Sequence, residues 1–344
     1  MRSPNVQELF LQPRVQLNGT SDPCAGDLTN ATTGDDPTAT FEQCANSGVT
    51  AAQYGRILAN PAGQYNGRVG GNPGLEPEKA DTYSYGIVLT PAFLPSFSLS
   101  LDYYDIKVDK LIGQVGQDLI LGQCLEGGTE FCSAVNRVPL NGSLWLGSTG
   151  YIEDPIINTG SLQTKGIDAE ANYRFDVGGA GQLAFTLIGT YTDEYMVEPL
   201  PGVPTFDCAG LYGTVCGTPI PQWRHKLRAN WQTPWGLDLS LTWRHIDKVL
   251  VDGTNPDTGA QPVLATDRQL GARNYIDVSA SYSFTDVGVF SGLTGRLGIN
   301  NLADKDPPLY GAANCIAVFC NGNTFPQVYD TLGRYVFLGI TADF

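Results

Sequence analysis

Eight cysteines are the residues whose spacing points most directly to a chemistry. They fall into four couples that are close in sequence, and each couple lies within one predicted loop. Cysteines that close short loops in this way are typical of disulfide bonds made in an oxidising compartment. We therefore predict that the chain leaves the cytosol. The predicted pairs are Cys24 with Cys44, Cys124 with Cys132, Cys208 with Cys216, and Cys315 with Cys320.

Residues suited to catalysis or metal binding are scarce. His225 and His245 are the only histidines, and their spacing fits neither a nucleophilic triad nor a three-ligand metal site. Cys315 and Cys320 match half of a zinc site, but no second half exists, so a small disulfide is the preferred interpretation. We expect no catalytic residue, no metal, no cofactor and no enzyme activity.

Basic residues on one face of a predicted strand form the main candidate binding feature. Arg224, Lys226 and Arg228 share this face, and matching apolar faces across the following turn places Arg224 opposite Arg244. Like charges directly opposite one another are destabilising. Our hypothesis is that this basic ladder faces the inside of a barrel and meets acids from elsewhere in the protein or an anionic substrate. The alternative is neutralisation by neighbouring acids of the sheet, such as Asp238.

Aromatic residues in the predicted loops form a second candidate binding set. Their rings are suited to stacking on sugars or flat ligands. Tyr-rich loops also occur where a protein is merely held at a membrane surface, so both interpretations stay open. The candidates are Tyr54, Tyr65, Trp145, Tyr151 and Tyr212.

The elements that position these residues are predicted to be strands. Only 16% of the residues are charged, and the chain has 41 Gly and 16 Tyr, a composition that favours short strands joined by turns. Residues 97–104 alternate apolar and polar side chains, as in a strand with two different faces. Nine such strands are predicted, at 79–90, 96–107, 162–176, 182–193, 222–232, 237–248, 273–284, 293–301 and 333–344.

The connections between these strands are alternately short and long. The long ones lie near 108–161, 194–221, 249–272 and 302–332. Loops of this length are rare in compact soluble domains, whereas outer-membrane barrels combine short periplasmic turns with long extracellular loops. Trp223 and Trp231 share one face of a strand and are about 20 Å apart along the membrane normal, which approaches the spacing of two aromatic girdles. A soluble sandwich that buries these rings is the alternative.

Charge and hydropathy exclude other classes. The formal net charge is -15, which disfavours binding to nucleic acid phosphates, so no nucleic acid partner is expected. No stretch approaches the length of a transmembrane helix, and the first ten residues contain no apolar core of a signal peptide.

Four segments resemble motifs of the TonB-dependent outer-membrane receptors of Gram-negative bacteria, in the family's order. Arg2–Phe10 resembles R-[AS]-P-N-x-x-E-L-[FY], and Asn72–Tyr83 resembles N-P-x-L-x-P-E-x-[SA]-x-x-[YW]. Gly298–Lys305 resembles G-x-x-N-L-[FL]-D-K, although it has Ala in place of the large apolar residue. Tyr329–Tyr335 and the final Phe344 resemble the last strand, whose terminal aromatic residue is an assembly signal.

The resemblance implies an all-β fold: an antiparallel transmembrane β-barrel segment over residues 1–344, with about nine of the barrel's 22 strands and long disulfide-closed extracellular loops. The family's signal peptide, TonB box, plug domain and first barrel half are absent from the sequence. An open sheet would leave two unpaired edges in lipid. We therefore expect Met1 to be an internal residue or a miscalled start.

The implied function is that of an outer-membrane receptor that imports a nutrient, such as siderophore-bound iron, a vitamin or a carbohydrate. The implied partners are outer-membrane lipid, the barrel assembly machinery through the C-terminal strand, TonB–ExbB–ExbD through the absent N-terminal part, and the small-molecule nutrient itself. The main alternative is a small self-contained barrel or surface binding protein without energy coupling. A secreted β-sandwich enzyme is disfavoured because no catalytic constellation is present.

Overall fold

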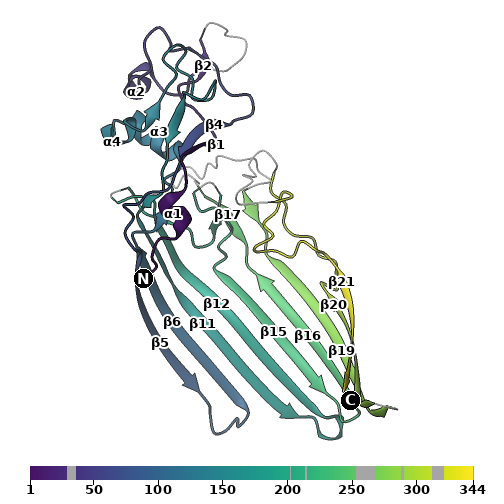
Figure 1. Ribbon diagram of the computed structural model, residues 1–344. Helices are drawn as coiled ribbons and strands as arrows, with labels where there is room; N and C mark the ends of the chain where they lie inside the picture. Colours follow the sequence, from purple (N-terminus) through teal and green to yellow (C-terminus); the bar gives the residue numbers. More distant parts are fainter. Residues whose placement is uncertain are drawn as a thin grey trace. The chain divides into compact units, whose positions relative to one another are not determined.

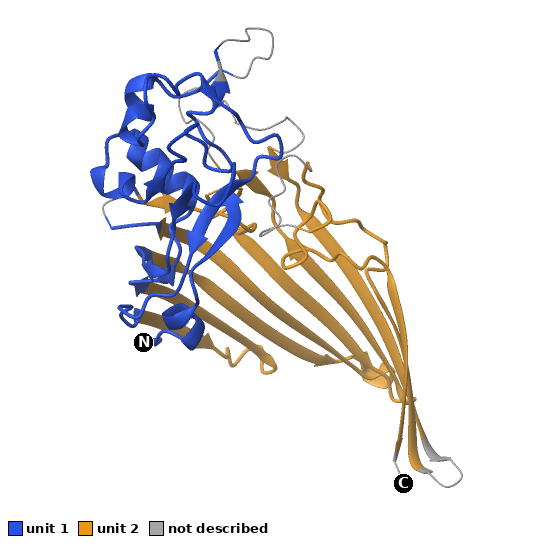
Figure 2. Ribbon diagram, turned by 45° about the horizontal axis from the view of Figure 1, so that its top comes forward, with its two compact units in different colours: residues 1–80, 108–161, 198–204 blue, residues 81–107, 162–197, 205–344 orange. Residues whose placement is uncertain are grey.

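The computed structural model describes residues 1–28, 36–201, 203–213, 215–252, 268–287, 290–311 and 321–343. The chain divides into two compact units, which are coloured separately in Figure 2. Unit 1 comprises residues 1–80, 108–161 and 198–204, and unit 2 comprises residues 81–107, 162–197 and 205–344. None of the helices in the described ranges has the length and apolar character that a membrane crossing requires.

Unit 2 is built on one large sheet in which strands that follow one another along the chain also lie side by side (Figure 1). All nine predicted strands are confirmed, and the pairs from β12 to β21 are antiparallel. The sheet strands are β5 (Lys79–Leu89), β6 (Phe97–Asp109), β11 (Ser161–Asp176), β12 (Gln182–Glu198), β15 (Trp223–Gln232), β16 (Leu237–Ile246), β19 (Arg273–Val287), β20 (Phe290–Asn300) and β21 (Tyr335–Asp343), with β13 (Phe206–Asp207) paired to β12.

The predicted asymmetry of the connections is also confirmed. The short connections include the 3-10 turn η1 (Gly178–Ala180), and the long loops carry β14 (Leu211–Tyr212), β17 (Val249–Val251) and β18 (Gln269–Leu270). These three short strands form their own sheet, and a core of Tyr212, Tyr310, Phe325 and other apolar residues packs there.

Alternation gives the large sheet one apolar and one polar face. On the apolar face, Leu241 lies between Ala229 and Val278 of the neighbouring strands. At the last strand this face is open to the surroundings: Leu338 is 74% exposed and Ile340 is 71% exposed. A sandwich would cover such residues with a second sheet. An exposed apolar face is instead the pattern of a sheet that faces lipid.

The register between β15 and β16 corrects one prediction. Arg224 lies opposite Ile246, and it is Lys226 that lies opposite Arg244. The cause is the turn, a three-residue loop that ends at Gly236 (φ 79°) and is closed by a hydrogen bond from the Thr233 amide to the Leu237 carbonyl. The shift is two residues, so each side chain keeps its predicted face.

Unit 1 has its own sheet, helices and core. The strand β4 pairs antiparallel with β1 and parallel with β9, so segments far apart in sequence form one sheet. Its elements are α1 (Val6–Phe10), β1 (Arg14–Gly19), β2 (Gly26–Asp27), α2 (Phe41–Asn46), β3 (Arg56–Ile57), β4 (Tyr65–Val69), β7 (Ile112–Gly113), α3 (Gln117–Leu125), α4 (Thr129–Cys132), β8 (Val135–Asn136), β9 (Tyr151–Glu153) and β10 (Ile157–Asn158).

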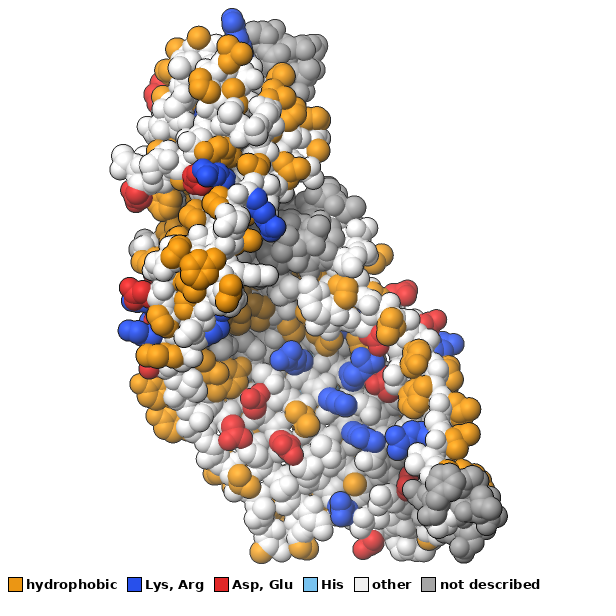
Figure 3. Space-filling model, in the orientation of Figure 1, with side chains coloured by type: hydrophobic (Ala, Val, Ile, Leu, Met, Phe, Trp, Pro, Cys, Tyr) orange, Lys and Arg blue, Asp and Glu red, His pale blue; other side chains and the backbone are white. Residues whose placement is uncertain are grey.

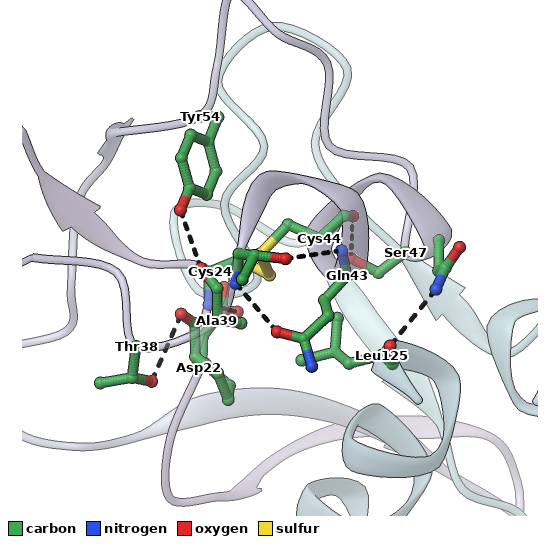
Figure 4. The surroundings of a disulfide bond; sticks show 12 residues. Asp22, Cys24, Thr38, Ala39, Gln43, Cys44, Ser47, Tyr54 and Leu125 are labelled. Carbon is green, nitrogen blue, oxygen red and sulfur yellow. Dashed lines mark hydrogen bonds between the residues drawn. A yellow bond between two sulfur atoms is a disulfide. The ribbon is translucent and has the colours of Figure 1, made fainter. Parts of the chain in front are cut away.

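Disulfides and apolar packing hold unit 1 together. The predicted pairs Cys24–Cys44 and Cys124–Cys132 are confirmed, as is Cys208–Cys216 in unit 2. Figure 4 shows the bond from Cys44 of α2 to Cys24. The backbone around it is held by hydrogen bonds such as that from the Tyr54 hydroxyl to the Ala39 carbonyl. The fourth predicted pair, Cys315 with Cys320, lies outside the described residues, as does Phe344.

A buried ion pair crosses the unit 1 core. The Arg137 guanidinium donates two hydrogen bonds to the Asp22 carboxylate, at 2.7 and 2.9 Å, and one to Ser47 Oγ. The two charged side chains are 4% and 0% exposed. By contrast, the ion pair between Arg68 and Glu153 is open to solvent, with both side chains more than a third exposed.

We predict that Arg137→Met lowers the stability of unit 1 by about 3–5 kcal/mol, because it leaves the Asp22 carboxylate buried without its partner. The matched control, Arg68→Ala, should cost less than about 1 kcal/mol, since exposed pairs are screened by solvent. Amide hydrogen exchange of residues 41–57 in the detergent-solubilised protein measures both effects. Equal exchange in the two variants would contradict the assignment.

Candidate functional site

The basic residues of β15 line a hollow on the polar face. Arg224 and Lys226 project to this side because their positions lie opposite Thr190 and Ile188 of β12, which line the same hollow. The hollow has a volume of about 310 Å³ and lies at the long-loop end of the sheet. We call it the basic pocket. Its remaining lining includes Arg244, Ile246 and Val328.

Arg244 is the member of the basic ladder with acidic partners. Its guanidinium donates two hydrogen bonds to Asp277 of β19, at 2.8 and 2.9 Å, and one to Asp330 of a long loop, at 2.8 Å. The same group lies over the Tyr275 ring, 4.9 Å from its centroid. The neutralisation that we considered for the ladder therefore exists at Arg244, and it comes from these two acids.

The other ladder residues are not neutralised in this way. Within the described ranges, Arg224 and Lys226 have no ion pair, although Lys226 lies directly opposite Arg244. Arg228 donates hydrogen bonds to the neutral oxygens of Asn230 and Ser240. Asp238, our predicted neutralising acid, lies opposite Gln232 instead.

A second hollow continues the polar face toward the short turns. Its volume is about 350 Å³, and it is lined by Arg228 and Arg296 together with several Asn, Gln and Ser side chains. Asp238 lies in this lining. The polar face thus presents cations along two adjoining hollows.

Acidic side chains occupy the neighbouring part of the same face. The Thr190 hydroxyl, next to Arg224, donates to Asp168 of β11, and Glu170 follows two residues later on the same side of that strand. Figure 3 shows Lys and Arg side chains gathered over β15 and β16, with Asp and Glu side chains beside them. On the polar face, these acids of β11 therefore lie beside the cations of β15, with Thr190 and Ile188 of β12 between them.

Chemically, the basic pocket can bind an anion. It offers two cationic side chains that have no ion pair among the described residues and that can donate charge-assisted hydrogen bonds, next to the apolar surface of Ile188, Ile246 and Val328. No group of three or more His, Cys, Asp or Glu side chains placed to bind a metal is found in the described part of the chain.

The two histidines lie on the opposite, apolar face. His225 stacks on His245 with ring centroids 5.1 Å apart, and Trp223 and Trp243 flank them. The Trp223 indole donates to His225 Nδ1, and the Trp243 indole donates to Asn274. Trp243 lies opposite Leu227, four residues along the strand from Trp223.

The structure corrects the set of candidate loop aromatics. Tyr65 is 4% exposed and Tyr212 is fully buried, so their rings pack in the two cores and are not available to a ligand. Tyr54 and Trp145 are half-buried, and the Trp145 indole donates to the Leu58 carbonyl. Tyr151 packs under the Arg68 guanidinium. The remaining candidates, Tyr54, Trp145 and Tyr151, all belong to unit 1.

The acids that hold Arg244 were not anticipated from the sequence. Asp330 lies in the segment Tyr329–Tyr335, and Asp277 accepts a hydrogen bond from the Asn301 amide in the segment Gly298–Lys305. These two segments are also joined directly, because the Arg334 amide donates to Asp304. The motif resemblance was the available signal that these residues act together.

A comparable cluster joins the other two motif segments in unit 1. Arg2 forms ion pairs with Glu8 and Glu78, at 2.9 and 2.7 Å. Asn5 and Glu8 complete a capping box at the start of α1. The hydrogen bond from the Arg2 guanidinium holds the pKa of the Glu78 carboxyl below its ordinary value.

Together, the two-faced antiparallel sheet, the short turns and the long loops define an outer-membrane type of β-barrel sheet. A family model described as TonB dependent receptor-like, beta-barrel matches residues 27–302, and the chain belongs to this family. Members of this family are outer-membrane proteins of Gram-negative bacteria.

Solved structures show the same fold at low sequence identity. Two structures of the ferric enterobactin receptor from Pseudomonas aeruginosa match with a TM-score of 0.51. The receptor in complex with BCV-L6 is 17% identical to this chain, and a mutant receptor in complex with enterobactin is 16% identical. Each match covers 80% of this chain and 33% of that one. The siderophore receptor PirA from Acinetobacter baumannii matches with a TM-score of 0.46 at 14% identity, over 80% of this chain and 33% of that one. This chain matches about a third of the length of these receptors. No curated protein matches it.

We predict that Arg244→Met loosens the long loops, because Asp277 and Asp330 lose their shared cation, at a cost on the order of 2 kcal/mol. Lys226→Met is the matched control on the facing position, and its effect should stay within about 0.5 kcal/mol. Amide hydrogen exchange at residues 301–305 and 328–334 should be faster in Arg244→Met than in Lys226→Met. The assignment is wrong if both variants exchange alike.

Proposed function

We propose that this chain is the C-terminal barrel part of a TonB-dependent transporter in the outer membrane of a Gram-negative bacterium. The observation that carries the proposal is the two-faced sheet: one face is apolar and exposed, and the other carries cations in open hollows. Such a sheet is stable in lipid when the apolar face lies outward and the polar face lines an interior.

The remaining parts follow from the same physics. The edge strands β5 and β21 have unpaired backbone groups on one side, which lipid cannot satisfy. We propose that further strands of the receptor close the barrel, and that a plug domain fills its interior. In this proposal TonB–ExbB–ExbD supplies the energy through the N-terminal part, and the barrel assembly machinery recognises the last strand.

The proposed cargo is a small nutrient, and the basic pocket favours an anionic one. The solved receptors of similar fold are named for siderophores, and an iron chelate is therefore the first substrate class to test. Vitamins and carbohydrates stay as candidates, because solved structures at 14–16% identity are informative about the fold and not about the substrate.

A small self-contained barrel without energy coupling is the second candidate. An antibody raised against residues 321–334 distinguishes it on blots of purified outer membranes. We expect a native protein well above 36.9 kDa. A heat-modifiable band at 36.9 kDa would instead favour the small barrel and end the transport proposal.

The role of the basic ladder is tested by charge reversal in the full receptor. We expect Arg224→Glu with Arg228→Glu to reduce uptake of ferric enterobactin, the first probe, or to release the plug domain to protease, since either partner would be anionic. The variant with both residues changed to Lys keeps the charges and should behave like the wild type. Unchanged uptake together with unchanged plug protection would rule out this role.

A further inference from the structure

Unit 1 contains a hollow of its own, which shares no lining residue with the basic pocket. Its volume is about 270 Å³, and three stretches of the chain form its walls: the region of α3 and α4, the segment after β9, and the turn at 200–201. All of these belong to unit 1. Its apolar lining includes Ile120, Phe131, Ala134, Ile157 and Leu200.

The charged residues of this lining are all acidic. Glu130, Glu153 and Asp154 line the hollow, and no Lys, Arg or His does so among the described residues. Glu153 already has a partner in Arg68, at 2.8 Å. For Glu130, the described residues provide no cationic partner.

Asp154 is the unusual member of the set. Its side chain is buried, and its carboxylate accepts hydrogen bonds from the backbone amides of Val115 and Gly116, without a cationic side chain among the described residues. Burial raises the pKa of this carboxyl. A buried carboxylate without a counter-charge is costly, and a bound cation would reduce that cost.

We propose that this hollow is a binding site for a small apolar molecule with a positive charge, an aromatic or aliphatic amine. The apolar walls take the body of the molecule, Phe131 of the lining can contact an aromatic group, and the carboxylates of Glu130 and Asp154 attract the charge. A body of about ten heavy atoms suits a hollow at the small end of ligand sites. This proposal does not depend on the proposed transport function.

Phenethylamine is the probe, and phenethyl alcohol and 3-phenylpropionate are its neutral and anionic counterparts. Calorimetry or saturation-transfer NMR on the full chain in detergent micelles measures their binding. We expect the amine to bind, the alcohol to bind about tenfold more weakly, which is the ordinary effect of losing one charge-assisted contact, and the anion not to bind.

Three variants locate the site. Ala134→Trp fills the hollow and should abolish binding, with hydrogen exchange of unit 1 as the check on folding. Glu130 is exposed, so Glu130→Gln should leave the fold intact. This variant should bind phenethylamine less than about threefold more tightly than phenethyl alcohol. Glu126→Gln, an exposed acid outside the lining, should change nothing. Equal binding of amine and alcohol, or a preference untouched by Glu130→Gln, overturns the proposal even if Ala134→Trp fails to fold.

Discussion

Antiparallel pairing is the constraint on which the rest of the structure depends. Because residues directly opposite one another point to the same side, a row such as Ala229, Leu241 and Val278 continues one face across three strands. The same pairing aligns Arg228, Thr242 and Asp277 on the other face. The apolar exterior and the charged hollows are thus two results of one hydrogen-bonding pattern.

Strands and turns were predictable because their signals are local. Alternation within ten residues placed the nine long strands of the large sheet within a few residues of their observed bounds, but it did not predict the two-residue strand β13. Three cysteine pairs followed from spacing alone. The β15–β16 register was two residues off because the type of turn at Gly236 decides it, and alternation does not change under a shift of two.

Features that depend on distant parts of the chain were not predictable in the same way. Unit 1 forms because β4 pairs with both β1 and β9, and the β4–β9 pair joins segments more than eighty residues apart. Tyr65 lies in β4, and its ring is buried in the core that this pairing creates. No local sequence pattern indicated that core. Arg224, Lys226 and Arg228 could be assigned to one face from the sequence, but the partners of Arg244 required the fold.

The described disulfides share a property with a consequence for biogenesis. Cys24–Cys44, Cys124–Cys132 and Cys208–Cys216 span 20, 8 and 8 residues, and no strand of the large sheet lies between the two cysteines of any of these pairs. Oxidation can therefore be completed on the unfolded chain before any strand is paired. Among the described disulfides, none can therefore lock two strands of the large sheet together in a wrong order.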